Sequence, residues 1–254
     1  MLIGRDTRTA TRLLPYLLIP TYRKKDMSRL IKLPERLDKI AAFIEKGASV
    51  VDVGSDHGLL PVYLAQSGLA TRIIASDISP GSLGAARRAA SKHGVVENIE
   101  FIETPGLDGI ADTMVDTIVI AGMGGQNIAS IICEAPWVKK RKVRLILQPQ
   151  SKTDELCGFL RSTGYSLRDA EIVRDRGRYY IVIVASSGRP RSSLSPEMEL
   201  YSKLAAKKCP LLTKYIDMLI TKTQSAAASV KNSDPTKYET LHKRLTDLRN
   251  IREL

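Results

Sequence analysis

Short apolar runs alternate with helix-patterned segments through the middle of the chain. Five runs have the length and β-branched content of buried strands, at residues 49–53, 72–76, 99–102, 115–120 and 143–147. Segments between and after them carry helical spacing, at residues 59–67, 79–93, 126–132 and 152–163. Buried strands separated by helices at this rhythm predict an α/β fold with a parallel, doubly wound, Rossmann-like sheet.

Further signals complete this predicted domain at both ends. Leu37, Ile40, Ala41 and Ile44 follow helical spacing before the first strand. Residues 166–174 and 179–184 have the pattern of a closing strand pair.

The pattern changes after the stretch SSGRPRSSLSP, which has the composition of a linker. Apolar positions from 198 to 220 predict a helix that faces a partner element, and residues 232–235 predict a turn. A second helix follows, with apolar residues spaced by 3, 4, 3 and 3 at Tyr238, Leu241, Leu245, Leu248 and Ile251. This coiled-coil-like run is short, so we expect a folded-back helical pair rather than a dimeric rod, and a monomer.

These patterns divide the chain into an N-terminal extension (residues 1–28), a catalytic domain (29–187) and a helical appendage (188–254). The first 26 residues have no clear period, whereas Met27 opens a sequence that resembles a natural protein start. We therefore interpret them as an upstream extension or a misassigned start. A targeting leader ranks second, because the segment is rich in Arg but not in Ser.

The excess of positive charge lies on the flanks of the predicted domain. The chain has 39 Lys and Arg against 27 Asp and Glu, a formal net charge of +12. Residues 1–28 contribute +4, residues 29–186 contribute +2, and residues 187–254 contribute +6. This distribution favours an appendage that binds a polyanion such as nucleic acid, the alternative being that charge serves solubility alone.

Cysteine and histidine usage indicates a cytoplasmic protein without a metal site. Cys133, Cys157 and Cys209 lie far apart and form no CxxC pair. The three histidines are also scattered. This usage argues against a disulfide framework and fits a reducing cytosol. No apolar run approaches the ~20 residues of a membrane-spanning helix, so no membrane partner is expected.

The segment VVDVGSDHG has the form of a cofactor-binding turn after a strand. Gly54 and Gly58 allow close approach of backbone to a ligand. The third glycine of a dinucleotide turn is missing, and Asp56 would repel a phosphate there. S-adenosylmethionine has no phosphate and carries a sulfonium and an ammonium, so the acidic turn favours that cofactor. The alternative is an ordinary strand-to-helix turn with solvated carboxylates.

Two further strand ends carry candidate chemistry. Asp77 ends the next predicted strand, where a carboxylate can accept the ribose hydroxyls of an adenosine, and Ile78 can pack on its adenine. The alternative role for Asp77 is to cap the following helix. The fourth strand ends in IVIAGMGG, whose small residues leave backbone room beside the transferred methyl group, or merely open a helix.

The motifs DVGSDHGLLP, IVIAGMGG, LILQP and GRYYIVIVA occur together in this order and spacing. With them the chain resembles the bacterial tRNA (adenine-22-N1)-methyltransferase family over residues 33–254. The terminal helical pair is similar to that family's coiled-coil appendage. The resemblance implies methyl transfer from S-adenosylmethionine to N1 of an adenine in the D-arm region of tRNA, at position 22.

The motifs and the resemblance together give three sets of expected site residues. Cofactor contacts are expected from Asp52, Gly54, Ser55, Asp56, Gly58, Asp77, Ile78, Gly122 and Met123. Catalytic roles are expected for Asp56 and His57, which can stabilise the cationic methylated ring or accept its amino proton. Substrate contacts are expected from Arg36, Gly124, Gly125, Arg178 and Tyr179.

The chain departs from the family pattern in three places. The family's Gly-Asp-Gly-Leu after the third strand is replaced around Thr104 and Pro105, so the carboxylate expected on the adenine amino group is absent. Glu103, Asp108 or backbone is the candidate replacement. Pro34 replaces the Ser of the family's opening Ser-x-Arg-Leu motif. Cys209 replaces the Gly of the Gly-Pro pair in the family's appendage.

Other functions remain as alternatives. The altered third-strand turn favours a methyltransferase-fold protein that binds RNA with little or no turnover. A small-molecule methyltransferase would leave the basic appendage without a purpose. An NAD dehydrogenase is disfavoured, because the third glycine of its dinucleotide-binding turn is missing from this chain. N1 lies on the Watson–Crick edge, so the RNA hypothesis requires an unpaired or flipped-out base.

Overall fold

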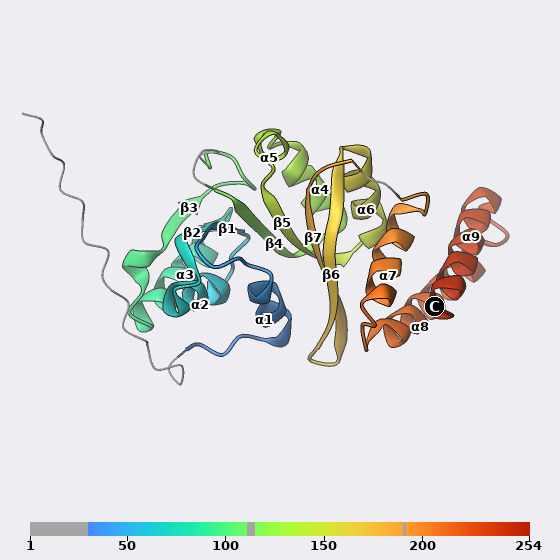
Figure 1. The fold of residues 1–254 in the computed structure, drawn as a ribbon, viewed down its shortest axis with the longest axis horizontal. Coiled ribbons are helices and arrows are strands. Elements are labelled where there is room, and N and C mark those ends of the chain that lie inside the picture. The colour runs from blue at the N-terminus through green and yellow to red at the C-terminus, as the bar shows by residue number, and fades with distance from the viewer. Residues whose placement is uncertain (1–29, 111–114, 190–191) are drawn as a thin grey trace, which may run out of the picture.

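The computed structural model describes residues 30–110, 115–189 and 192–254. Within these residues the strands form one seven-stranded sheet of order β3-β2-β1-β4-β5-β7-β6 (Figure 1). The strands are β1 (Ala48–Val53), β2 (Ala70–Asp77), β3 (Glu100–Glu103), β4 (Thr117–Gly124), β5 (Arg144–Ser151), β6 (Tyr165–Asp175) and β7 (Arg178–Ser187). The predicted N-terminal extension lies outside the described residues.

The sheet confirms the doubly wound prediction and shows how it closes. The strands β1 to β5 pair in parallel, whereas β7 pairs antiparallel with both β5 and β6. The strand pair predicted at residues 166–174 and 179–184 is therefore the antiparallel edge of the sheet. Strand order reverses between β1 and β4, and parallel sheets of this kind bind ligands at that point, beyond the carboxyl ends of the strands.

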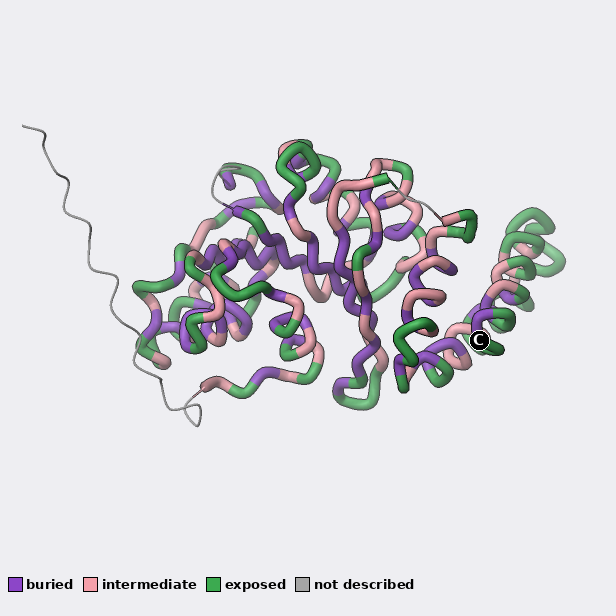
Figure 2. Tube along the Cα trace, in the orientation of Figure 1, coloured by how far each residue is buried: buried purple, intermediate pink, exposed green. Residues whose placement is uncertain are grey.

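Helices cover both faces of the sheet. They are α1 (Glu35–Ala42), α2 (Leu59–Ser67), α3 (Pro80–Lys92), α4 (Gly125–Cys133), α5 (Trp137–Lys140) and α6 (Thr153–Ser162), with a 3₁₀ turn, η2, at Val96–Asn98. The helices α1, α2 and α3 share one apolar cluster with the sheet, and α4 and α6 share another. Figure 2 shows the buried residues concentrated along the central strands between these layers. The Ser79 side chain caps α3 by accepting from the Ser82 backbone N–H at 3.3 Å.

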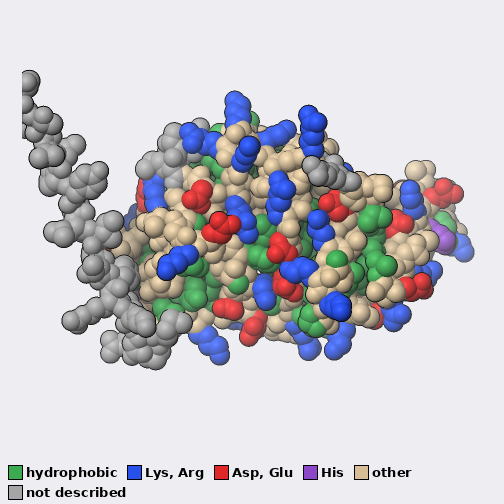
Figure 3. Space-filling model, viewed as in Figure 1, with side chains coloured by type: hydrophobic (Ala, Val, Ile, Leu, Met, Phe, Trp, Pro, Cys, Tyr) green, Lys and Arg blue, Asp and Glu red, His purple; other side chains and the backbone are tan. Residues whose placement is uncertain are grey.

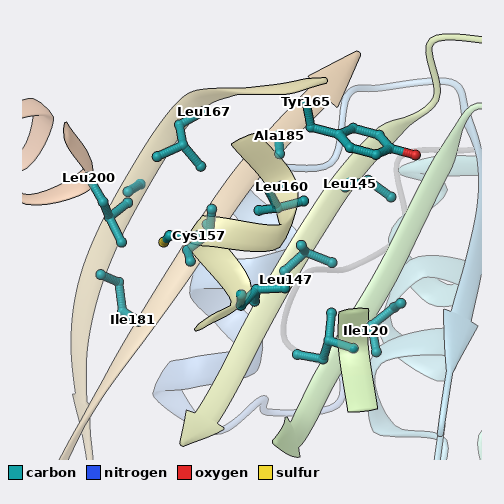
Figure 4. Close-up of a cluster of buried hydrophobic side chains, with 14 of the residues drawn as sticks. Ile120, Leu145, Leu147, Cys157, Leu160, Tyr165, Leu167, Ile181, Ala185 and Leu200 are labelled. Carbon is teal, nitrogen blue, oxygen red and sulfur yellow. The ribbon is translucent and has the colours of Figure 1, made fainter. Parts of the chain in front are cut away.

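The C-terminal region continues the core before it leaves the sheet. The single helix predicted over residues 198–220 is wrong, because the chain forms α7 (Pro196–Ala206) and α8 (Leu212–Val230) with a break at Cys209 and Pro210. Leu200 of α7 packs into the cluster that contains Leu160 and Ile181 (Figure 4). The domain border at residues 187 and 188 stays a prediction, with α7 sharing the catalytic core.

The helices α8 and α9 (Pro235–Arg252) form the predicted folded-back pair at one end of the molecule (Figure 1). Asp234 caps α9 by accepting from the Lys237 backbone N–H at 2.9 Å. Leu245, Leu248 and Ile251 are buried, whereas the first half of α9 is largely exposed. The pair therefore docks by its open end, where α8 begins and α9 finishes, and presents the connecting turn at residues 231–234 to solvent.

Candidate active site

A cavity of about 720 Å³ opens where β1, β2, β4 and β5 end. Its lining includes eleven residues that come from the carboxyl ends of these strands, the turns after them and α1: Arg36, Asp52, Gly54, Ser55, Asp56, His57, Asp77, Ile78, Gly122, Met123 and Gln150. A second group lies on the side of β3 and α4: Thr104, Pro105, Gly106, Asn127, Ser130 and Ile131. The cavity thus sits where the strand order reverses.

The glycines of the turn after β1 are required by close contacts. Gly54 has φ of +73°, and a Cβ there would collide with the methyl group of Met123. Gly58 has φ of +68°, and its Cβ would lie 2.7 Å from the Cβ of Ala86 on α3. Gly54 therefore lets the β1 and β4 turns meet at the cavity, whereas Gly58 packs α2 against α3 outside the lining.

The Asp77 carboxylate organises two loops at once. One oxygen accepts from the Asp56 backbone N–H at 3.2 Å, and the other accepts from the Ser79 backbone N–H at 2.8 Å. A carboxylate has about four acceptor sites, so both oxygens retain capacity toward the cavity. Its capping-type contact and a ligand role are therefore compatible. Beside it, Ile78 is 70% exposed and offers an apolar surface.

Asp52 is a buried carboxyl group at the floor of the cavity, and it is 6% exposed. Burial raises its pKa from 3.8 to about 7, against a hydrogen bond from Ser55 and the charge of Arg36, which lower it. The charge of Asp77 raises the pKa further. A carboxyl group with such a pKa is poised to ionise when a cation enters.

Arg36 joins α1 to the β6–β7 hairpin at the rim of the cavity. Its Nε lies 4.0 Å from Oδ2 of Asp175, which is largely buried, and its charge also acts on Asp52. Among the described residues of the lining, Arg36 is the single Lys or Arg side chain. It is placed to bind an anionic group of a ligand.

Asp56 and His57 lie together at the open side of the cavity. The Nε2 of His57 is 3.6 Å from Oδ2 of Asp56, and both side chains are about 70% exposed. Asp56 has φ of +47°, a left-handed conformation for a residue other than glycine. This backbone turn, held by Asp77, directs both side chains to the rim.

Within its described residues, 104–110 and 115–116, the loop after β3 places no carboxylate in the cavity lining. The Thr104 hydroxyl donates to the Asp108 backbone carbonyl at 2.8 Å, and neither Glu103 nor Asp108 belongs to the lining. A Cβ on Gly106 would lie 3.2 Å from Ile131, so α4 packs directly over this loop. The sequence candidates Glu103 and Asp108 are thus placed away from the cavity.

Polar side chains of α4 face the same loop. Asn127 and Ser130 both line the cavity, and the Ser130 hydroxyl donates to Glu134 at 2.9 Å. The Asn127 amide also lines the cavity, and it makes no side-chain hydrogen bond within the described residues. Sequence reasoning missed it, although its position in the first turn of the helix after a glycine-rich strand end was a usable signal.

The predicted site residues divide between the cavity and its surroundings. Ten of them line the cavity: Arg36, Asp52, Gly54, Ser55, Asp56, His57, Asp77, Ile78, Gly122 and Met123. Gly58, Gly124, Gly125, Arg178 and Tyr179 do not. Gly125 packs against the backbone carbonyl of Lys152, and Tyr179 lies on β7 with Arg174 5.9 Å from its ring centre. Their expected cofactor or substrate contacts stay predictions.

Two classes of site are not seen in the part of the chain that the structure describes. No group of three or more His, Cys, Asp or Glu side chains is arranged to hold a metal ion there. Within the same residues, no helix has the length and apolarity needed to span a membrane.

Comparisons with known proteins agree with this geometry. A family model described as a methyltransferase domain matches residues 33–183. The tRNA (adenine(22)-N(1))-methyltransferase of Bacillus subtilis is 33% identical over 211 residues, which cover 81% of this chain and 89% of that protein. The crystal structure of the B. subtilis m1A22 tRNA methyltransferase is 30% identical with a TM-score of 0.75, covering 87% of this chain and 99% of that one.

A further solved structure contains a ligand. Streptococcus pneumoniae Sp1610 in complex with S-adenosyl-L-methionine is 27% identical with a TM-score of 0.75. The match covers 85% of this chain and 98% of that chain. The similarity therefore extends over nearly the whole of each relative.

Proposed function

The chain belongs to the tRNA (adenine(22)-N(1))-methyltransferase family, and on this premise we propose that it methylates N1 of the adenine at position 22 of tRNA, with S-adenosylmethionine as the methyl donor. The observation that carries the proposal is the cavity at the strand-order reversal, which has carboxylates where a nucleotide phosphate would otherwise bind. The similarity over 81% of the chain supports the same activity.

The residues of the cavity fit this cofactor. S-adenosylmethionine, when bound, supplies an electrophilic methyl group on a sulfonium. We propose that Asp77 accepts the ribose hydroxyls and that Ile78 packs on the adenine. Asp52 holds the ammonium group, because a carboxyl with a pKa of about 7 ionises readily beside a cation. Gly54 allows the close approach of the turn to the ligand.

Arg36 receives a proposed role different from the substrate contact suggested by sequence. It is the single Lys or Arg among the described lining residues, and it stands near Asp52. We therefore propose that its guanidinium binds the cofactor's carboxylate, next to the ammonium held by Asp52. This arrangement orients the amino-acid end of the cofactor.

The acceptor adenine needs positioning more than activation. Its N1 already has a lone pair, so in-line alignment can provide much of the rate enhancement. Asp56 and His57 lie at the rim and are proposed to stabilise the methylated ring or accept an amino proton. Gly122 keeps the β4 edge of the cavity free of a side chain, which leaves room for the base.

Basic surfaces outside the cavity are proposed to hold the RNA backbone. Figure 3 shows Lys and Arg side chains along the edge of the molecule near α5, where residues 139–142 are consecutive Lys and Arg. The α8–α9 pair carries further Lys and Arg on its exposed faces. Contacts to phosphate weaken steeply with salt, so tRNA affinity is expected to fall between 50 and 200 mM salt by roughly tenfold or more. We propose the cytoplasm as the site of action, because tRNA is the substrate.

The activity is tested by methyl transfer to unmodified tRNA followed by nucleoside mass spectrometry. We expect 1-methyladenosine at position 22 and none when that adenine is replaced. A methylated guanine or cytosine would instead refute the proposed acceptor. Calorimetric titration with S-adenosylmethionine separates the enzyme from an inactive RNA-binding relative, since absence of cofactor binding would contradict the enzymatic function.

We propose that Asn127 replaces the carboxylate that the family places on the cofactor's adenine. Asn127 lines the cavity together with Thr104 and Gly106, on the side where the family's carboxylate is missing. We expect Asn127→Ala to weaken binding of S-adenosylhomocysteine about tenfold, the loss of roughly one hydrogen bond in a cavity. The measurement is isothermal titration calorimetry, with the inosine analogue of that ligand as a second probe.

The control is Gln126→Ala, on the same helix but outside the lining, where the amide bonds Glu155 at 2.5 Å. Wild type is expected to prefer the adenine ligand over the inosine ligand, and the Asn127 variant to lose that preference. Equal discrimination by both proteins would show that another group contacts the adenine amino group.

A further inference from the structure

The cavity has a part that the proposed cofactor contacts do not use. The proposed contacts place the cofactor at the ends of β1 and β2 and beside the loop after β3, through Asp52, Asp77 and Asn127. The ends of β4 and β5 form the remaining wall, at Gly122 and Gln150. The inference below rests on the proposed function. If the cofactor takes the first part of the cavity, the acceptor base lies against the wall that Gly122 and Gln150 form.

Gln150 follows Pro149 near the carboxyl end of β5. Its amide nitrogen lies 3.5 Å from where a Cβ on Gly122 would be, so the side chain extends across the end of β4. Gly122 has φ of +83°, a conformation that favours glycine and leaves the neighbouring surface bare. The amide therefore stands over a backbone platform at the cavity wall.

The Gln150 side chain has no structural task in the fold. It is exposed, and no hydrogen bond or ion pair of its amide occurs within the described residues. Its neighbour Gln148 differs, because that side chain is fully buried and its amide donates to the Pro149 carbonyl at 3.0 Å. Gln148 thus shapes the strand end, while Gln150 keeps its donor and acceptor free for a ligand.

The chemistry of an amide matches one edge of adenine. A Gln side chain can accept from the N6 amino group and donate to N7 at the same time. This pairing leaves N1 open for methyl transfer. Guanine presents acceptors at both O6 and N7, so the amide oxygen would face another acceptor. We propose that Gln150 is the residue that selects adenine as the methyl acceptor, through N6 and N7.

The test removes the N7 acceptor from the substrate and the amide from the protein. tRNA assembled with 7-deazaadenosine at position 22 retains N1 and N6 but cannot accept at N7. We expect wild type to lose about tenfold in kcat/KM on this tRNA, and Gln150→Ala to lose at least tenfold on normal tRNA. The variant is expected to show no further loss on the 7-deaza substrate, because the contact is already absent.

Two controls separate recognition from a general defect. Gln126→Ala removes an exposed amide outside the cavity and is expected to respond to 7-deazaadenosine as wild type does. Cofactor affinity, measured by calorimetry with S-adenosylhomocysteine, should be the same for Gln150→Ala and wild type within about twofold.

The outcomes distinguish this inference from the proposed function. If wild type methylates no adenine of tRNA, the proposed function fails. If wild type methylates adenine and 7-deazaadenine equally well, or if Gln150→Ala remains as sensitive to 7-deazaadenine as wild type, the assignment of Gln150 is overturned. A matching loss of cofactor affinity in Gln150→Ala would overturn it as well.

Discussion

Replacing Asp52 with Asn is expected to stabilise the ligand-free protein and weaken cofactor binding at the same time. Burial raises the pKa of Asp52 from 3.8 to about 7, so the folded state resists its ionisation. A group whose folded pKa is raised contributes stability that is complete below its unfolded pKa and is lost as pH rises through the folded pKa. The ionised carboxyl is therefore a cost to folding above pH 7.

The shift corresponds to about 4 kcal/mol at about 1.36 kcal/mol per pKa unit. We expect Asp52→Asn to gain up to this amount of unfolding free energy at pH 8, with a smaller gain at pH 5. Urea denaturation at the two pH values measures it. Asp38→Asn, an exposed carboxyl on α1, is the control and should change stability by less than about 0.5 kcal/mol.

The same substitution is expected to weaken cofactor binding. Asn has no charge to attract the ammonium group, and a charge-assisted hydrogen bond contributes about 1.5–3 kcal/mol. The Kd for S-adenosylhomocysteine should therefore rise by one to two orders of magnitude. In wild type the affinity should increase from pH 6 to pH 7.5 as Asp52 ionises. A variant that is destabilised at both pH values while it binds normally would contradict this role of Asp52.

Arg244→Leu is expected to destabilise the protein by about 3–5 kcal/mol, because it leaves a buried carboxylate without its cation. Arg244 of α9 donates to both oxygens of Glu197 on α7, at 2.9 and 2.7 Å. Glu197 is 5% exposed and also accepts from the Tyr201 hydroxyl at 2.7 Å. This pair anchors the α8–α9 arm to the catalytic core, and urea denaturation measures its loss.

A matched control lies on the same helix. Arg252 pairs with Asp217 at 2.5 Å, but both side chains are about half exposed, so Arg252→Leu should cost no more than about 1 kcal/mol. The double variant Glu197→Gln, Arg244→Leu keeps an acceptor for Tyr201 without a buried charge and should recover most of the stability. Equal costs for the two single variants would show that burial of Glu197 is not decisive.

The proposed role of the arm in RNA binding gives this substitution a functional readout. If α8 and α9 hold tRNA, loosening their anchor should lower tRNA affinity while cofactor affinity is retained, as measured by filter binding and calorimetry. Removal of every residue after 187 is a less selective test, because α7 contributes Leu200 and Tyr201 to the core shared with the sheet. Arg244→Leu perturbs the arm with less disturbance of that core.

Local sequence patterns predicted most elements because their causes are local. The predicted segment 59–67 coincides with α2, and the predicted segment 79–93 contains α3, because both depend on adjacent residues. The prediction of one helix over residues 198–220 was wrong. The apolar spacing continues past Cys209 and Pro210, but the helical backbone is interrupted there. Periodicity identifies a buried face, but it does not show where one helix ends and another begins.

The site was predictable where its residues follow one strand. Gly54, Asp56 and His57 lie in one turn, and Asp77 ends the adjacent strand, so local sequence places all four at one sheet edge, where they line the cavity. Asn127 and Gln150 were missed, because each is a polar residue in no recognisable motif. Only the packing of distant segments shows that both line the cavity.

The sequence by itself determined the alternation of strands and helices, the glycine turn and the acidic residues at the strand ends, because short-range sterics and burial decide these. The tertiary structure decided which strand ends meet. Only the order of the sheet brings Arg36, Asp52 and Asp175 together, and desolvation in that setting raises the pKa of Asp52. The placement of the Gln150 amide beside Gly122 and the pairing of Glu197 with Arg244 likewise arise from packing between distant segments.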